Sequence, residues 1–268
     1  MSHARLHAVT RGHPDNPPVL FLHGFLGSHR EWLPLMESLA ERYYCLAVDL
    51  PGHGQSADIQ DEAAHTFAGA AKAVLEALPI ERHQQLRLVG YSMGGRLSLY
   101  LAIHHSDRVG QAIIESSSPG LLDVETARAR EKQDTRWAHR FRTEPLDEVL
   151  ADWYRQPIFA SLRDQPETFT RMLAERRHNT GEGVARSIQG MSVGRQTPLW
   201  DHLAQLAVDV CLLVGELDRK YQLVAEQMRV TSERIQVEMI KGAGHNIHLE
   251  QPEAFACCVK AQLDAFSG

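Results

Sequence analysis

The chain has 268 residues, 43% of them hydrophobic and 23% charged, with a net charge of −6 at pH 7. This length suits one large globular domain, or a core with a small insertion. The negative balance and the lack of a long basic tract argue against nucleic acid and anionic membrane surfaces as partners. No apolar run reaches the roughly 18 residues of a membrane span, so we expect no membrane insertion.

Residues 1–5 lead directly into a strand-like pattern and contain no apolar core of a signal peptide. Cys45 and Cys211 lie in apolar strand patterns, whereas Cys257 and Cys258 are adjacent in a helical pattern. This distribution favours reduced, buried thiols in a cytoplasmic protein. No spacing of cysteine and histidine fits zinc, so we expect no metal, and nothing suggests an organic cofactor.

Short apolar runs alternate with helical patterns along the chain. In chain order they predict strand 18–22, helix 32–42, strand 44–48, helix 63–78, strand 86–89, helix 93–105, strand 111–116, strand 210–214, strand 235–240 and helix 252–266. Strands that alternate with helices predict an α/β fold with a mainly parallel sheet and right-handed crossovers.

The segment 119–203 interrupts this alternation, because it is helical in character and has no convincing strand. It is also rich in arginine and aromatic residues. We interpret it as a helical cap inserted between two strands of the sheet. The predicted core then consists of residues 1–118 and 204–268.

Residues 90–94, GYSMG, fit the pattern G-x-S-x-G of a nucleophile elbow. A strand-like run precedes them and a helical pattern follows, as that turn requires. Glycines flank the serine because the turn is strained and a Cβ atom on either side would clash. The turn lifts the hydroxyl out at the top of the sheet, near the positive end of the next helix. The pattern predicts Ser92 as the reactive serine.

A serine hydroxyl is a weak nucleophile and needs an adjacent base, for which histidine suits because it titrates near neutrality. The histidine in turn needs a carboxylate that fixes its tautomer. Asp218 follows strand 210–214 and His245 follows strand 235–240, in the serine, acid, histidine order of α/β-hydrolases. Both lie just past a strand end, where ligand-binding loops gather. Glu216 is a competing acid, but its neighbourhood favours Asp218.

The tripeptide 23–25, HGF, follows the first predicted strand and completes this pattern. It lets the backbone amide of Phe25 point at a developing oxyanion, and the amide of Met93 would be the second donor. His23 either contacts ligand or braces the loop, and both readings stay open. Residues 49–56 form a tight loop whose polar groups order the turn, and we assign them no chemistry.

At these residues the chain resembles the α/β-hydrolase superfamily, which implies the fold but not the reaction, since this fold hosts many chemistries. Arg96 indicates which kind of substrate such a protein would bind. It comes one helical turn after Ser92 and can face the same cavity. An unpaired guanidinium is costly to desolvate, so an anionic substrate would supply its partner. An ion pair with a core carboxylate is the alternative.

Longer stretches carry a more specific resemblance. They are GYSMGGR at 90–96, SPGL at 118–121, WAHRF at 137–141 and ADWYRQP at 151–157. Together they resemble the 2-succinyl-6-hydroxy-2,4-cyclohexadiene-1-carboxylate synthases, lyases of menaquinone (vitamin K2) biosynthesis, nearly from end to end. The resemblance implies elimination of pyruvate from 2-succinyl-5-enolpyruvyl-6-hydroxy-3-cyclohexene-1-carboxylate, with no water added and no cofactor.

The resemblance also implies a site. The substrate carries three carboxylates, so an arginine-bearing pocket is expected, and Ser92, activated by His245 and Asp218, would take the ring proton. The amides of Phe25 and Met93 would stabilise charge on the succinyl carbonyl oxygen. Implied carboxylate ligands are Arg96, Arg130 and Arg176, and implied pocket-lining residues are Tyr91, Trp153 and Tyr154.

Several alternatives stay open. Arg128 could replace Arg130, and Arg177 could replace Arg176, because the cap stretch can be aligned in more than one way. The rival function is a serine hydrolase of acidic esters, or of carbon–carbon bonds in vinylogous diketones, which would use the same triad. A ligand receptor without catalysis is disfavoured by the intact triad, and the oligomeric state is not indicated.

Overall fold

The computed structural model describes residues 5–81 and 84–266. Its centre is a seven-stranded sheet in the order β1-β3-β2-β4-β5-β6-β7, in which only β1 pairs in the antiparallel direction. The strands are β1 (Ala8–Arg11), β2 (Pro18–Leu22), β3 (Tyr44–Val48), β4 (Leu86–Tyr91), β5 (Val109–Glu115), β6 (Asp209–Gly215) and β7 (Ile235–Ile240). The expected mainly parallel α/β sheet is confirmed.

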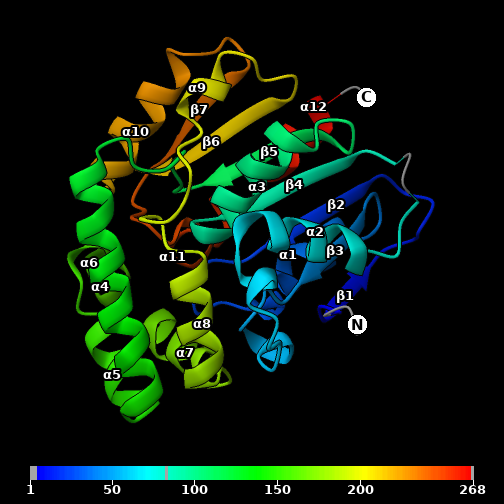
Figure 1. Ribbon diagram of the computed structural model, residues 1–268. Helices are drawn as coiled ribbons and strands as arrows, with labels where there is room; N and C mark the ends of the chain where they lie inside the picture. Colours follow the sequence, from blue (N-terminus) through cyan, green and yellow to red (C-terminus); the bar gives the residue numbers. More distant parts are fainter. Residues whose placement is uncertain (1–4, 82–83, 267–268) are drawn as a thin grey trace.

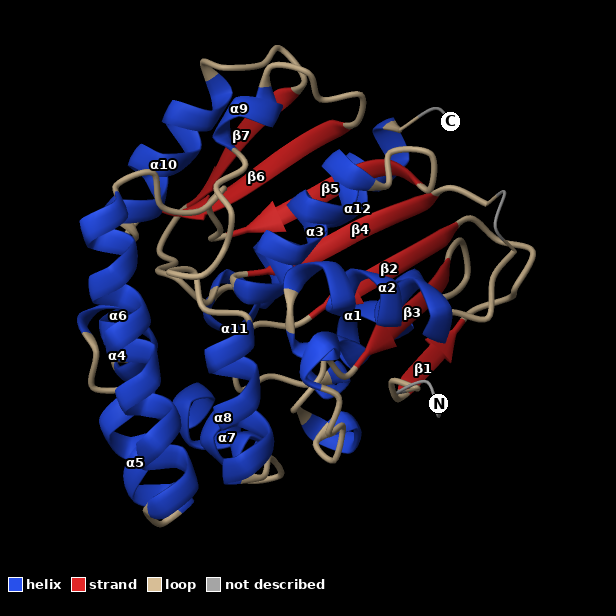
Figure 2. Ribbon diagram, in the orientation of Figure 1, coloured by secondary structure: helices blue, strands red, loops and turns tan. Residues whose placement is uncertain are grey.

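Helices cover both faces of this sheet (Figure 2). Those of the core are α1 (Leu33–Leu39), α2 (Phe67–Ala77), α3 (Met93–His104), α10 (Arg219–Arg229), α11 (Ile247–Glu250) and α12 (Pro252–Ala265). Because side chains alternate along a strand, Leu20 and Leu22 of β2 pack with α2 and α3, whereas Val19 and Phe21 pack with α1 and α12. Burial on both faces explains why the strands are continuously apolar.

Some element boundaries differ from those expected. The helix predicted at 63–78 is wrong as one piece, since a 3₁₀ turn, η3 (Glu62–His65), precedes α2 and Thr66 separates them. Thr66 is extended, and its hydroxyl accepts a hydrogen bond from the amide of Gly69 at 3.1 Å, which begins a new helix. The helix predicted at 32–42 is likewise a 3₁₀ turn, η1 (His29–Trp32), followed by α1.

Every residue from 116 to 208 is described, and none of them lies in a strand. The helices of this segment are α4 (Val124–Thr143), α5 (Leu146–Trp153), η4 (Pro157–Phe159), α6 (Ala160–Arg163), α7 (Pro166–Arg176), α8 (Gly181–Gly190) and α9 (Trp200–Leu203). Helices α4 to α8 stand together beside the end of the sheet toward which β5 and β6 point (Figure 1). They have their own apolar cluster, which includes Phe141, Trp153 and Val184 and is joined by Leu26 of the core. We retain 119–203 as the proposed extent of the cap.

The expectation of buried thiols holds for Cys45 and Cys211 and is wrong for Cys257, which is exposed in α12. Cys258 is partly buried, and all four cysteines are free thiols. In the described part of the chain, no helix is long and apolar enough to cross a membrane. Residues 1–4 of the N-terminal segment lie outside the described residues.

Candidate active site

Ser92 lies at the sharp turn between β4 and α3, where its backbone has φ 50° and ψ −106°. A positive φ is strained for any residue other than glycine. Close packing explains the flanking glycines. A Cβ atom on Gly94 would lie 2.2 Å from the carbonyl oxygen of Leu22, and one on Gly90 would lie 2.2 Å from Ser98 Oγ. The turn presents the Ser92 hydroxyl at the N-terminus of α3.

The fold brings Ser92, His245 and Asp218 together. His245 Nε2 lies 3.4 Å from Ser92 Oγ, and His245 Nδ1 lies 2.7 Å from Asp218 Oδ2. The side chains of His245 and Asp218 are only 4% and 5% exposed, so little water screens their interaction. Glu216, the competing acid, is exposed and accepts a hydrogen bond from the amide of Gly242. Asp218 is therefore the carboxylate that contacts and orients the imidazole.

The loop that carries His245 is held by a residue that the sequence analysis missed. Buried Glu250 accepts hydrogen bonds from the amides of Gly244 at 2.8 Å and Asn246 at 3.0 Å, one on each side of His245. The sequence signal that could have suggested this contact is the position of Glu250, five residues after His245. The contact limits how far the imidazole can move from Ser92.

The amides of Phe25 and Met93 have no hydrogen-bond acceptor within residues 5–81 and 84–266. Both residues line the cavity onto which Ser92 opens, so their amides are free to stabilise an oxyanion. His23 is fully buried and braces the loop, since its Nε2 accepts from the amide of Leu50 at 2.9 Å and its Nδ1 lies 2.7 Å from the carbonyl oxygen of Gly24. Burial lowers the pKa of His23, in keeping with a neutral ring.

The loop 49–56 is ordered by its polar groups, as expected. Asp49 is buried and accepts hydrogen bonds from the amides of His29 at 2.7 Å and Gln55 at 2.9 Å. None of these three residues lines the cavity at Ser92.

Ser92 opens onto a cavity of about 160 Å³ between the sheet and the cap. His245 and Asp218 line a neighbouring cavity of about 260 Å³, whose other wall is formed by η4 and α6. The predicted residues on the wall of the Ser92 cavity are Phe25, Ser92, Met93, Arg96, Arg130 and Trp153. Tyr91, Tyr154 and Arg176 are not among its lining residues.

Arg96 is partly buried in this cavity, and no carboxylate pairs with it among the described residues. Its guanidinium donates to Gln196 Oε1 and to the carbonyl oxygen of Met191, both at 2.9 Å, and lies 5.0 Å from the ring centre of Phe67. All three contacts leave its charge without a counter-ion. Burial, together with the nearby charge of Arg130, lowers the pKa of Arg96 to about 10. The alternative of an ion pair with a core carboxylate is therefore not realised.

Arg130 lies across the same cavity, and its Nε donates to Asp134 Oδ1 at 2.8 Å. Asp134 is buried and also accepts a hydrogen bond from the hydroxyl of Ser192 at 2.7 Å, which fixes the direction of the guanidinium. The two terminal nitrogens of Arg130 have no partner among the described residues. Arg128 instead pairs with Glu125 in an exposed contact away from the cavity. The structure therefore favours Arg130 over Arg128.

Arg176 lies elsewhere. Its side chain is 2% exposed, forms an ion pair with Glu31, and donates from Nε to the hydroxyl of Tyr154 at 3.0 Å. The expectation that it binds a substrate carboxylate is not met in this arrangement, because its charge is already neutralised by the protein. Arg177 is exposed and pairs with Asp147, so it does not reach the cavity either.

The predicted aromatic residues also fall into those that line the Ser92 cavity and those that do not. Trp153 lines the cavity and packs against Phe25 with ring centres 4.9 Å apart. Tyr91 is buried behind the turn, where its ring lies 5.5 Å from that of His245. Tyr154 is buried in the cap against Arg176. Of the three, only Trp153 is placed to touch a ligand beside Ser92.

Lys220 and Tyr221 line the cavity and were missed by the sequence analysis. Lys220 is exposed and has no ion pair among the described residues, so it adds a third cation to the wall. The ring of Tyr221 lies 4.7 Å from that of His245. They lie two and three residues after Asp218, in the first turn of the helix that follows strand β6, and this position is the signal that could have indicated them.

The fold and the site together define a class of protein. The family described as the alpha/beta hydrolase fold matches residues 17–252. Among solved structures, MenH from S. aureus has a TM-score of 0.90 at 27% identity, over 98% of both chains. The enol-lactonase from Burkholderia xenovorans LB400 has a TM-score of 0.80 at 20% identity, over 97% of this chain and 96% of that one, which shows the fold alone.

Two curated relatives are more specific. The 2-succinyl-6-hydroxy-2,4-cyclohexadiene-1-carboxylate synthase of Serratia proteamaculans is 39% identical over 253 residues, 92% of this chain and 93% of the relative. The synthase of the same name from Photorhabdus laumondii is 36% identical over 257 residues, 96% of this chain and 88% of the relative. The chain therefore belongs to the α/β-hydrolase fold and, within it, to the family of 2-succinyl-6-hydroxy-2,4-cyclohexadiene-1-carboxylate synthases.

Proposed function

We propose that this protein is a carbon–oxygen lyase of menaquinone biosynthesis. It eliminates pyruvate from 2-succinyl-5-enolpyruvyl-6-hydroxy-3-cyclohexene-1-carboxylate and forms 2-succinyl-6-hydroxy-2,4-cyclohexadiene-1-carboxylate. The observation that carries the proposal is that a reactive serine shares one small cavity with three cations, of which Arg96 and Lys220 have no carboxylate partner among the described residues. A tricarboxylate fills that need, whereas an apolar ester would leave the charge of Arg96 buried and unpaired.

In this proposal the triad works as a base. Ser92 Oγ passes its proton to His245 Nε2 and takes the ring proton next to the succinyl ketone, while Asp218 stabilises the resulting imidazolium. The amides of Phe25 and Met93 stabilise the negative charge that develops on the ketone oxygen. The electron pair then moves through the conjugated system and breaks the bond from the ring to the enolpyruvyl oxygen. The departing enolate takes the proton that His245 holds and becomes pyruvate, which restores the neutral imidazole, so no water is consumed.

The cations serve binding in the same proposal. Arg96 and Arg130 hold substrate carboxylates inside the cavity, and Trp153 packs on the ring. Lys220, at the exposed side, attracts the third carboxylate. The sequence-based expectations of a cytoplasmic location and of no nucleic-acid partner stay predictions.

The test is release of pyruvate from substrate freshly generated by the enzyme that forms the enolpyruvyl cyclohexene. The account predicts release well above the spontaneous background, without incorporation of solvent oxygen into the ring product. Release at the background rate, together with fast saturable hydrolysis of acidic esters or vinylogous diketones, would show that the same triad serves a hydrolase instead.

A further inference from the structure

A buried chain of charged groups starts beside the catalytic histidine. His248 lies in α11, three residues after His245. Its Nδ1 lies 2.9 Å from both carboxylate oxygens of Glu115, and its amide donates to Glu115 at 3.2 Å. Its Nε2 lies 3.9 Å from Glu31 Oε1, and all three side chains are at most 5% exposed. Nε2 makes no hydrogen bond, but the carboxylates of Glu115 and Glu31 on either side of the ring favour its protonated form, so we take His248 as a cation.

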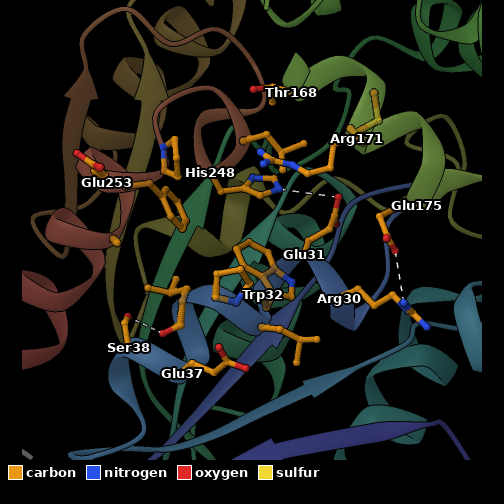
Figure 3. A pocket seen from close by; sticks show the side chains of 18 of the residues that line it. Arg30, Glu31, Trp32, Glu37, Ser38, Thr168, Arg171, Glu175, His248 and Glu253 are labelled. Carbon is orange, nitrogen blue, oxygen red and sulfur yellow. Dashed lines mark hydrogen bonds and ion pairs between the residues drawn. The ribbon is translucent and has the colours of Figure 1, made fainter. Parts of the chain in front are cut away.

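The chain continues from the core into the cap. Glu31, in η1, forms the ion pair with Arg176, and Arg176 donates to the hydroxyl of Tyr154 at the end of α5. Figure 3 shows Glu31 and His248 pointing toward one another on the wall of a cavity of about 780 Å³ that α7 also lines. The cap thus touches the core through a pair of buried, opposite charges.

The other end of the chain reaches the reactive serine. The backbone carbonyl of Glu115 accepts a hydrogen bond from the amide of Ser92 at 2.9 Å. The ring of Tyr91 lies 4.8 Å from the ring of His248 and 5.5 Å from the ring of His245. A shift of His248 would therefore move the strained turn and the catalytic loop together.

The four charges of Glu115, His248, Glu31 and Arg176 sum to zero. Burial raises the pKa of Glu31, but the charges of Arg176 and His248 lower it to about 2. Burial lowers the pKa of His248, but Glu115 and Glu31 raise it to about 9. Removing a whole buried ion pair is often tolerated, whereas removing one partner leaves an uncompensated buried charge and is strongly disruptive.

We infer that Arg176, Glu31 and His248 are positioning residues, which hold the Ser92 turn and the His245 loop in place against the cap, and that Arg176 acts through Glu31 rather than by binding a substrate carboxylate. This inference deepens the proposed function and rests on it for the reaction served. It gives a role to an arginine that the Ser92 cavity does not contain.

The test compares Arg176→Met with the double variant Glu31→Gln, Arg176→Met in the pyruvate-release assay. Arg176→Met is expected to lower kcat by about tenfold or more with a smaller change in KM, because Glu31 then draws His248 away from Glu115. The double variant, which removes the whole pair, is expected to return to within about threefold of the wild-type kcat. Arg177→Met is the matched control, since its exposed partner Asp147 belongs to the cap, and it should behave as wild type.

A direct substrate contact gives the opposite pattern. Arg176→Met would then mainly raise KM, and adding Glu31→Gln would recover nothing, which would overturn the inference. If Arg176→Met does not fold, Arg176→Lys takes its place, because a retained charge should keep most of kcat in a positioning role.

A second readout separates this inference from the proposed function. An uncharged alkyl fluorophosphonate labels Ser92 by forming a phosphorus–oxygen bond to Oγ, with loss of fluoride and transfer of the serine proton to His245. The rates of labelling are expected to follow the kcat values. Labelling should be slow in Arg176→Met and should return to near the wild-type rate in the double variant. Labelling of Arg176→Met at the wild-type rate would refute the positioning role. A wild-type protein that is labelled but releases no pyruvate would refute the proposed function alone.

Discussion

At the scale of single residues, Arg96 is the group whose environment most needs a ligand. It is held by Gln196 and the Met191 carbonyl, both neutral, and its charge has no counter-ion among the described residues. The pKa of about 10 still leaves it protonated near neutral pH. A substrate carboxylate that replaces water at this guanidinium forms a charge-assisted hydrogen bond in a partly dry cavity.

Replacement of Arg96 by methionine should therefore weaken substrate capture. Loss of one partner from a buried, hydrogen-bonded charge pair costs about 2–4 kcal/mol, which is about thirty- to a thousandfold in kcat/KM. Most of the loss should appear in KM, since Arg96 does not touch the reacting atoms. Steady-state pyruvate release measures both constants, and an unchanged KM would contradict the assignment.

His248 gives the protein a predictable pH dependence. Its pKa is about 9 in the folded protein and 6.5 in a free side chain, so its stabilising contribution is complete below pH 6.5 and is lost as the pH rises through 9. Burial lowers the pKa of His23, so titration of this residue affects stability only below pH 6.5. Burial raises the pKa of Cys45 to about 12, which affects stability only above its free value of 9.0.

The free energy of unfolding should thus fall between pH 7 and 9, and this fall should be absent from His248→Gln. Urea unfolding at three pH values across the window measures both slopes. Equal slopes in the two proteins would show that His248 is not a cation at neutral pH.

Single-residue chemistry was the part most open to prediction from sequence. The spacing of Ser92, Asp218 and His245 follows from strand ends, and the structure brings the three together. The partner of Arg176 could not be predicted in this way. Glu31 is 145 positions away, and nothing in its local sequence marks it as the counter-ion of a cap residue.

At the scale of elements, the turn between β4 and α3 is the most constrained. Gly94 packs against β2, where a Cβ atom would meet the carbonyl oxygens of Leu22 at 2.2 Å and His23 at 2.5 Å. Backbone atoms of a central strand cannot move aside as side chains do. The tight contact sets the height of Ser92 above the sheet.

Gly94→Ala should therefore destabilise the protein by about 3 kcal/mol or more and reduce pyruvate release. Gly110→Ala is the matched control, because the atoms nearest to its new methyl group belong to the side chains of Phe266 and Gln85, at 2.9 and 3.2 Å. Its cost should stay below about 1 kcal/mol. Similar unfolding midpoints for the two variants in urea would refute the close-packing argument.

The core strands were predicted well from sequence because their apolar runs are buried on both faces. Helix ends were predicted less well. Thr66 sits inside an apolar helical pattern, yet its hydroxyl caps α2 and ends the preceding turn. Threonine can either continue a helix or cap one, and only the surrounding packing decides which occurs.

At the scale of the whole molecule, the sheet with its helices and the cap meet at the reactive serine. The sheet has one apolar cluster on each face, and the cap has a third cluster that Phe25 and Leu26 join from the core. The cavity of about 160 Å³ lies between the sheet and the cap, so its walls come from both. The lack of strands in this segment predicted an inserted cap. The sequence could not predict that Arg96, Arg130 and Lys220 line the same cavity, because this depends on how the cap folds over the sheet.

The central claim is that Ser92 removes the ring proton that starts pyruvate elimination. The most direct measurement is pyruvate release by Ser92→Ala beside the wild type, with binding of the substrate checked separately. The account predicts that the variant binds substrate but loses most activity, by about a thousandfold or more, as removal of a triad member does elsewhere. Turnover by Ser92→Ala at the wild-type rate would contradict it.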